Sequence, residues 1–174
     1  MKRVLIVAFA ALLPAFHLQA QDEAFGWMCQ RNDPVSVAMA GVSLAPSSDI
    51  SFSAFRNPAV IPYSESRFAV TAAYSPAVGD MTTDGLDVGV GMKTGERLGF
   101  SVAGNYNSCG EYEVIDDSGN RNGMFKTSSM MFSAGLGLKV IDALSVGINL
   151  KYAGERLASD SNQGVFASDV YALY

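Results

Sequence analysis

Residues able to do chemistry are few in this chain of 174 residues. The single histidine, His17, lies in the amino-terminal stretch, so the remainder lacks an imidazole for Ser-His-Asp or Cys-His catalysis or for a histidine-containing zinc site. Glu111, Glu113, Asp116 and Asp117 cluster, but solvation of a loop explains their charge. No glycine-rich phosphate loop ends in Lys-Ser or Lys-Thr. We therefore expect neither an enzyme nor a cofactor.

Two further groups of residues suggest special roles that the sequence does not favour. Asp116, Ser118 and Asn120 alternate like calcium ligands, but the loop lacks glycine at its sixth position and glutamate at its twelfth. A turn is expected there, and no metal site. Cys29 and Cys109 permit one disulfide in an oxidising compartment. Two unpaired thiols are preferred, because a bridge would require the amino-terminal segment to reach the outer end of a strand.

The amino terminus has the pattern of a secretory signal peptide. Lys2 and Arg3 precede an apolar run from Val4 to Leu13, which is too short to cross a bilayer as a helix. Residues 1–20 are expected to be removed by cleavage after Ala20. The formal net charge is −5 without a basic patch, so no nucleic-acid partner is expected.

The elements that must position any site are strands. Five segments between residues 68 and 152 alternate apolar residues with small or polar ones, which is the period of a strand with two unlike faces. A sixth strand is expected over Val165 to Tyr174. The apolar members of the five segments are Phe68, Val70, Ala72 and Tyr74; Leu86, Val88, Val90 and Met92; Leu98, Phe100, Val102 and Tyr106; Met130, Phe132, Ala134, Leu136 and Leu138; and Leu144, Val146, Ile148, Leu150 and Tyr152.

Two architectures fit this alternation. A soluble sandwich would bury the apolar face in a core, whereas a membrane barrel would turn it toward lipid. The segment lengths suit tilted spanning strands of about 9–11 residues, and the opposite face is small and polar, which favours a wet barrel interior. Tight turns at 93–97 and 139–143 alternate with long connections at 75–85, 107–126 and 153–164, as in outer-membrane barrels. Tyr74, Tyr106 and Tyr152 are expected at the outer strand ends, as an aromatic girdle.

We therefore predict an all-β, antiparallel up-and-down transmembrane β-barrel, partial with about six strands, over residues 67–174. Residues 21–66 do not alternate cleanly and are punctuated by proline, so we expect a plug-like hatch region or a periplasmic lead-in there. Arg67, Lys93, Asn105, Lys139 and Lys151 are expected to line the lumen, either along a path or as ordinary polar filling.

The hatch region resembles a known family. A small-residue stretch from Ser36 to Val42 that contains Gly41, followed by Asn57-Pro58-Ala59 just before a strand, is similar to the hatch of FadL-type outer-membrane transporters, closest to the PorV/PorQ-like branch of Bacteroidetes. The resemblance implies a 14-stranded barrel with a small plug that passes hydrophobic molecules across the outer membrane. PorV relatives instead serve the type nine secretion system.

The expected strand number departs from that family. Six strands do not comfortably close a barrel, since eight is the smallest standard size and an open edge leaves backbone groups unpaired in lipid. We expect the front portion of a longer protein in preference to assembly from copies. The expected partners are outer-membrane lipid and either hydrophobic small molecules or secreted proteins. Passage of small molecules is the favoured function, with a secretion accessory role or an inactive fragment as alternatives.

Overall fold

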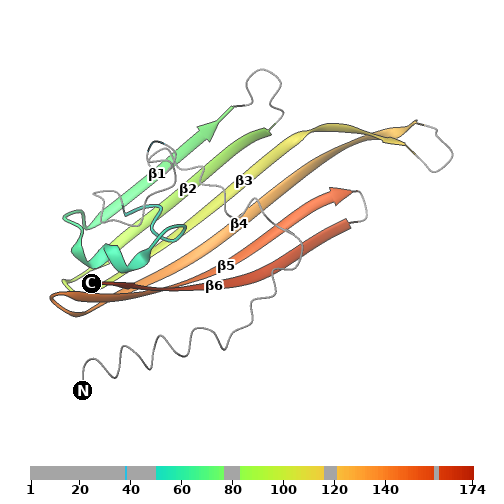
Figure 1. The fold of residues 1–174 in the computed structure, drawn as a ribbon. Coiled ribbons are helices and arrows are strands. Elements are labelled where there is room, and N and C mark those ends of the chain that lie inside the picture. Colours follow the sequence, from blue (N-terminus) through green and yellow to red (C-terminus); the bar gives the residue numbers. More distant parts are fainter. Residues whose placement is uncertain (1–37, 39–49, 77–82, 116–120, 159–160) are drawn as a thin grey trace, which may run out of the picture.

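The computed structural model describes residue 38 and residues 50–76, 83–115, 121–158 and 161–174. They form one antiparallel sheet in which each strand pairs with its neighbours in chain order (Figure 1). The sheet is open, with β1 and β6 at its edges, so the predicted all-β, up-and-down partial barrel of six strands is confirmed. The elements are η3 (Pro58–Tyr63), β1 (Phe68–Ser75), β2 (Thr83–Thr94), β3 (Leu98–Ile115), β4 (Arg121–Ile141), β5 (Leu144–Ala158) and β6 (Ser161–Leu173).

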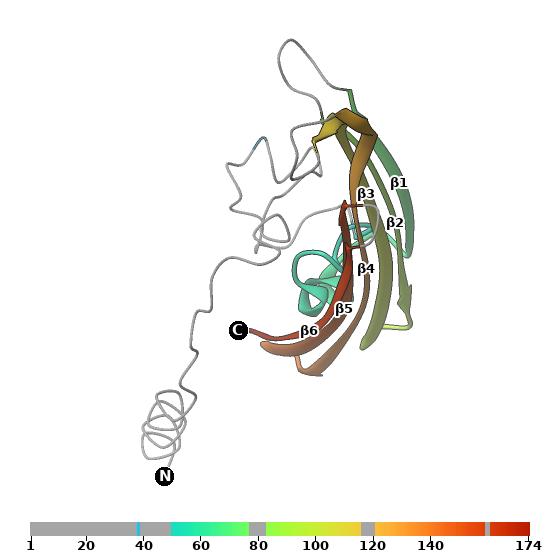
Figure 2. The same ribbon diagram turned by 90° about the vertical axis from the view of Figure 1, so that its right-hand side faces the viewer.

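The two faces of the sheet carry side chains of opposite character. The sheet curves around residues 50–64, which lie on its concave side (Figure 2). Small and polar residues at odd positions face this segment, and most of them are buried. Apolar residues at even positions form the convex face and are exposed. They include Phe68, Val70, Tyr74, Leu86, Val88, Val90, Met92, Phe100, Val102, Tyr106, Met130, Phe132, Leu136, Leu138, Val146, Ile148, Leu150, Phe166 and Val170.

The predicted alternation is therefore present, and its burial is the reverse of that in a soluble sandwich. Within the described residues, no second sheet or helix covers the convex face, whereas η3 and the turns before it lie on the concave one. The hydrophobic residues that are buried, such as Phe52 and Ile61, come mainly from this seated segment (residues 50–64). No helix among the described residues combines the length and hydropathy needed to cross a membrane.

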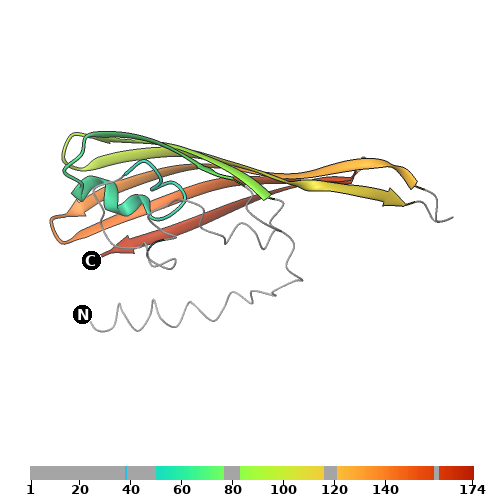
Figure 3. The ribbon, with the colours of Figure 1, turned by 90° about the horizontal axis from the view of Figure 1, so that it is seen from above.

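The strands are longer than the alternation predicted. β3 continues to Ile115 and β4 begins at Arg121, so most of the loop expected over residues 107–126 is strand. Residues 153–164 likewise belong largely to β5 and β6. Register shifts after Cys109 and Glu113 explain the error, because a bulge inserts a residue and breaks the period of two. The β3–β4 hairpin projects past the other strands as a two-stranded ribbon (Figure 3).

Strand register arranges the convex face in rows. Tyr74 and Tyr106 share one row, because both pair with Leu86. Tyr152 lies one row nearer the middle of the sheet, paired with Phe132. Two residues of strand rise by about 7 Å, so the third tyrosine of the predicted girdle is displaced by about that much from the other two along the strand direction.

Candidate functional site

The seated segment is the most distinctive feature of the concave face. Residues 51–56 form successive turns, and Asn57 then caps η3, accepting a 2.9 Å hydrogen bond from the Ala59 amide on its side-chain oxygen. Pro58 at the first helical position suits this start, because its fixed φ is helical and the amide it lacks would be unpaired there. The Asn57-Pro58-Ala59 motif thus builds a tight helical turn directly against the sheet.

Aromatic side chains anchor the amino-terminal half of the seated segment. The rings of Phe52 and Phe55 stack with their centroids 6.0 Å apart. They form a buried apolar cluster with Ala54 of the same segment and with Ala103 and Met131 on the concave face. Together with Ala153, these are the described sheet residues whose apolar side chains are buried. The cluster thus marks where the segment and the sheet match in polarity.

Glycines admit the backbone of the seated segment. A Cβ added at Gly137 would lie 2.0 Å from the Pro58 carbonyl oxygen, and one at Gly91 would lie 2.2 Å from the Ile50 carbonyl oxygen. A Cβ at Gly147 would lie 2.7 Å from the Ala59 amide nitrogen. Contacts this short exclude any side chain, so these glycines are among the places where the two backbones approach most closely.

Hydroxyl groups of the sheet satisfy carbonyls of the seated segment. The Ser133 hydroxyl donates to the Ala54 carbonyl at 2.5 Å, and the Ser145 hydroxyl donates to the Ala59 carbonyl at 2.6 Å. Both serines are buried. Buried carbonyl groups in irregular backbone need hydrogen-bond donors. The polar concave face supplies these donors to the seated segment.

Charged and aromatic groups secure the end of η3. The Lys93 ammonium donates to the Ser64 carbonyl at 2.8 Å, and the Tyr63 hydroxyl donates to the Asp142 carbonyl at 3.3 Å. Lys139 lies 5.4 Å from the centroid of the Tyr63 ring and pairs with Asp142 at 2.9 Å. The hydrogen bond from Lys139, together with the positive charge of Lys139, lowers the pKa of the Asp142 carboxyl below its usual value.

Two further groups of polar contacts lie on the same face. The side-chain amide of Asn105 donates to Asp87 at 2.7 Å, and that of Asn107 donates to the Asn105 side-chain oxygen at 2.7 Å. Lys151 and Asp169 form an ion pair at 2.5 Å between β5 and β6. These contacts link β2 to β3 and β5 to β6 through the interior side of the sheet.

The structure thus brings most of the predicted site residues to one face. Lys93, Asn105, Lys139 and Lys151 make their contacts on the concave side, whereas Arg67 is exposed beside the start of β1. Asn57, Pro58 and Ala59 are seated against β4 and β5. The predicted signal peptide, His17, Cys29, Gly41 and the 116–120 turn lie outside the described residues.

Sequence reasoning did not single out the glycines and serines that hold the segment. One signal was available: these glycines and serines occupy odd-numbered positions, as the other residues of the polar face do. Ser133, Gly135 and Ser145 are examples. Asn149 was also missed as a site residue. It is completely buried, and neither polar atom of its side chain has a hydrogen-bond partner among the described residues.

The contacts described on the concave face are packing contacts, hydrogen bonds and ion pairs between the sheet and the seated segment or between neighbouring strands. Among the described residues, no group of three or more His, Cys, Asp or Glu side chains is placed to hold a metal ion. No protein-family model matches the sequence, and no curated protein does so either. The function must therefore be argued from the geometry.

The glycine contacts predict that Gly137→Ala releases the seated segment. The new methyl group would overlap the Pro58 carbonyl, and such overpacking lowers the free energy of unfolding by about 1–3 kcal/mol. Trypsin digestion measures the release, because Arg56 is 4% exposed and should be cleaved only when the segment has left the sheet.

The matched control is Gly104→Ala, whose methyl group on the convex face would lie 3.4 Å from the Phe132 ring. This variant should resist trypsin as the parent protein does. Equal resistance of the Gly137→Ala variant would show that the segment is not held by this contact.

The hydroxyl contacts predict that Ser145→Ala destabilises the protein by about 1 kcal/mol, because the Ala59 carbonyl loses its donor. Ser101→Ala is the control: Ser101 is also buried on the concave face, but its hydroxyl has no partner among the described residues. Denaturant titration should show a lower midpoint for the first variant and little change for the second. Equal losses would mean that volume, not the hydrogen bond, matters.

Proposed function

We propose that this protein is an exported outer-membrane β-barrel protein of the FadL/PorV-like kind. In this proposal residues 1–20 are the signal peptide, residues 21–66 are the hatch region and residues 67–174 form the first part of the transmembrane wall. Its function would be the passage of hydrophobic small molecules across the outer membrane. The observation that carries the proposal is the reversed burial of the sheet, with an exposed apolar convex face and a buried polar concave face.

The physical argument concerns the solvent of the convex face. Phe132 and Leu150 are 55% and 61% exposed, and similar residues cover all six strands. Soluble monomers rarely expose continuous apolar patches beyond a few hundred Å², whereas a lipid-facing wall must be apolar. A spanning sheet also needs its edge strands paired, because lipid offers no hydrogen bonds to backbone groups. In this proposal β1 and β6 therefore pair with further strands.

The seated segment supports passage in preference to a merely structural wall. It occupies the concave side, which would be the lumen, and contacts the sheet through backbone, hydroxyl groups and one apolar cluster. Phe52, Phe55 and Met131 provide apolar surface inside an otherwise polar lumen. A hydrophobic solute needs apolar protein surface in the lumen if it is to leave the lipid phase. A plug that can be displaced would keep polar solutes out of the lumen.

One observation favours the second candidate, a secretion accessory barrel that binds secreted proteins. Ile115 and Met124 lie on the projecting β3–β4 ribbon and are 62% and 69% exposed. Exposed apolar residues on a projecting ribbon suit a protein partner. Retention of secreted proteins inside cells carrying Ile115→Ser and Met124→Ser, with unchanged fatty-acid uptake, would favour this candidate.

The lipid-facing wall predicts opposite behaviour for neighbouring residues. In a Trp27→Phe background, a tryptophan at Phe132 should be strongly quenched by phospholipids with brominated acyl chains, because position 132 lies on the convex face. A tryptophan at Met131, which is buried on the concave face, should be protected. The measurement is fluorescence in reconstituted vesicles. Equal quenching at both positions, or none at either, would contradict the proposal.

Passage predicts a selective uptake phenotype. Cells with the protein in their outer membrane should accumulate labelled long-chain fatty acid faster than cells without it, while uptake of a polar tracer stays unchanged. Gly137→Ala should admit the polar tracer as well, because it displaces the seated segment. Gly104→Ala serves again as the control. Fatty-acid uptake equal to that of cells lacking the protein would exclude the transporter function.

A further inference from the structure

The convex face of β4, β5 and β6 changes in polarity along the strands. Register joins one residue from each strand into rows, and successive rows are about 7 Å apart. The row nearest the β5–β6 turn is polar, the next contains two glycines, the third is aromatic, and the fourth places a leucine between an alanine and a serine. In this order the rows are Ser128, Arg156 and Asn162; Met130, Gly154 and Gly164; Phe132, Tyr152 and Phe166; and Ala134, Leu150 and Ser168.

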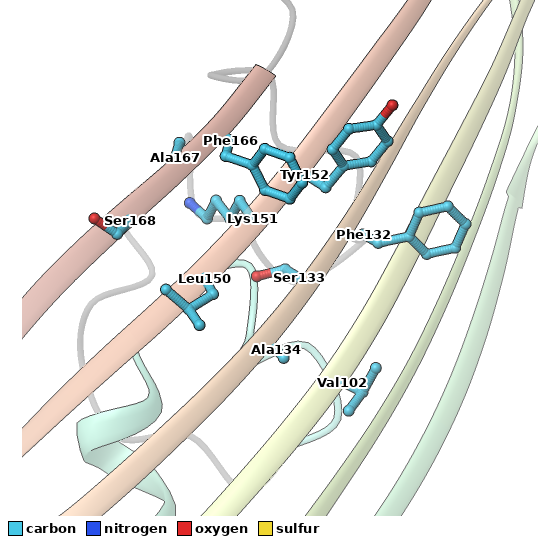
Figure 4. Close-up of a pocket in the computed structure, with 10 residues that line it drawn as sticks. All are labelled: Val102, Phe132, Ser133, Ala134, Leu150, Lys151, Tyr152, Phe166, Ala167 and Ser168. Carbon is cyan, nitrogen blue, oxygen red and sulfur yellow. The ribbon is translucent and has the colours of Figure 1, made fainter. Parts of the chain in front are cut away.

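An apolar groove of about 540 Å³ lies over the third and fourth rows. The short side chain of Ala134, between Val102 and Leu150, forms the bottom of the groove (Figure 4). The rings of Phe132 and Phe166 also line it. The Tyr152 and Phe166 rings lie 4.9 Å apart at its upper end. The groove is lined by residues of β3, β4, β5 and β6, and its lining is mainly apolar, which suits a hydrocarbon chain.

A second groove of about 370 Å³ continues from the first, with Tyr152 shared between them. It is hollowed at Gly154 and Gly164. The Tyr152 ring lies against Gly164, since a Cβ there would be 2.7 Å from the phenol oxygen. Arg156 borders this groove, is exposed, and lies 5.4 Å from the centroid of the Phe125 ring. The two grooves together form a track with a positive charge at its polar end and the apolar groove at the other.

We propose that these two grooves bind one anionic phospholipid, with an acyl chain in the apolar groove and the phosphate at Arg156. The site rests on the proposed function, because the convex face must lie in lipid. Three row spacings separate Arg156 from the Ala134 row, so the track is about 20 Å long, which is comparable with one leaflet of a bilayer with a hydrocarbon core of about 30 Å.

The charges around the grooves favour an anion. Glu155 borders the second groove, but it pairs with buried Ser129 in the strand register and belongs to the concave face. Lys151 borders the first groove and is neutralised by Asp169 on the concave side. Arg156 is therefore the charged group of the convex rows that line the grooves. A cation at the polar end of an apolar groove selects an amphiphile with a negative head over a zwitterionic one.

The test uses a tryptophan in the groove and a second tryptophan outside it, in the same register row of the convex face. In the Trp27→Phe background, the groove reporter is Phe166→Trp. The control reporter is Val88→Trp, since Val88 and Phe166 lie in one row of the convex face. Each protein is reconstituted in phosphatidylcholine vesicles containing a minor fraction of brominated phosphatidylglycerol or, at the same fraction, brominated phosphatidylcholine.

The groove reporter should be quenched about fivefold more effectively by brominated phosphatidylglycerol, as expected for one arginine at an anionic surface. The control reporter should be quenched equally by both lipids. Arg156→Gln should remove the preference, and Arg121→Gln, which alters an exposed pair with Glu113 on the ribbon, should retain it.

Equal quenching of the groove reporter by the two lipids would overturn the site while leaving the membrane wall intact. A preference that survives in the Arg156→Gln variant would also overturn it. Absence of quenching at both reporters with both lipids would contradict the membrane wall itself, and the site with it.

Discussion

The structure depends on one constraint, the strict alternation of side chains across the sheet. Because the period is two, a slip of one residue in any pairing would exchange the faces of that strand. Phe132 would then meet the seated segment, and Ser133 would lose its bond to the Ala54 carbonyl. The apolar convex face and the polar concave face are therefore set together, by the same register.

The seated segment explains why the concave face is polar. An irregular stretch of backbone brings carbonyl groups that need donors, and the sheet supplies them from Ser133 and Ser145. It also needs room, which Gly91, Gly137 and Gly147 provide by lacking side chains. Larger apolar residues at these positions would fill the concavity and exclude the segment. The seated segment therefore requires small and polar residues on the concave face. The apolar side chains of the strands lie on the convex face.

Much of this fold could be predicted from the sequence, because alternation is local. Pattern and spacing predict the apolar even positions from Phe68 to Leu150 and the up-and-down strand order. They left open whether the segment before the first strand is a plug or a periplasmic lead-in. The extent of β3 and β4 could not be predicted, since bulges near Cys109 and Glu113 break the period that identifies a strand. The contacts of Gly137 and Asn149 were also beyond reach, because they depend on which residue of a distant segment approaches the sheet. The exposed position of Arg67 reflects its place beside an edge strand, which parity alone does not reveal.

The central claim is that the convex face lies in hydrocarbon. A nitroxide scan along residues 130–138 of β4, in reconstituted protein with Cys29 and Cys109 changed to serine, tests it most directly. Collision with oxygen, which dissolves in lipid, should be greatest at the even positions, where collision with a water-soluble nickel chelate should be least. High accessibility to the nickel chelate at the even positions would place that face in water and contradict the account.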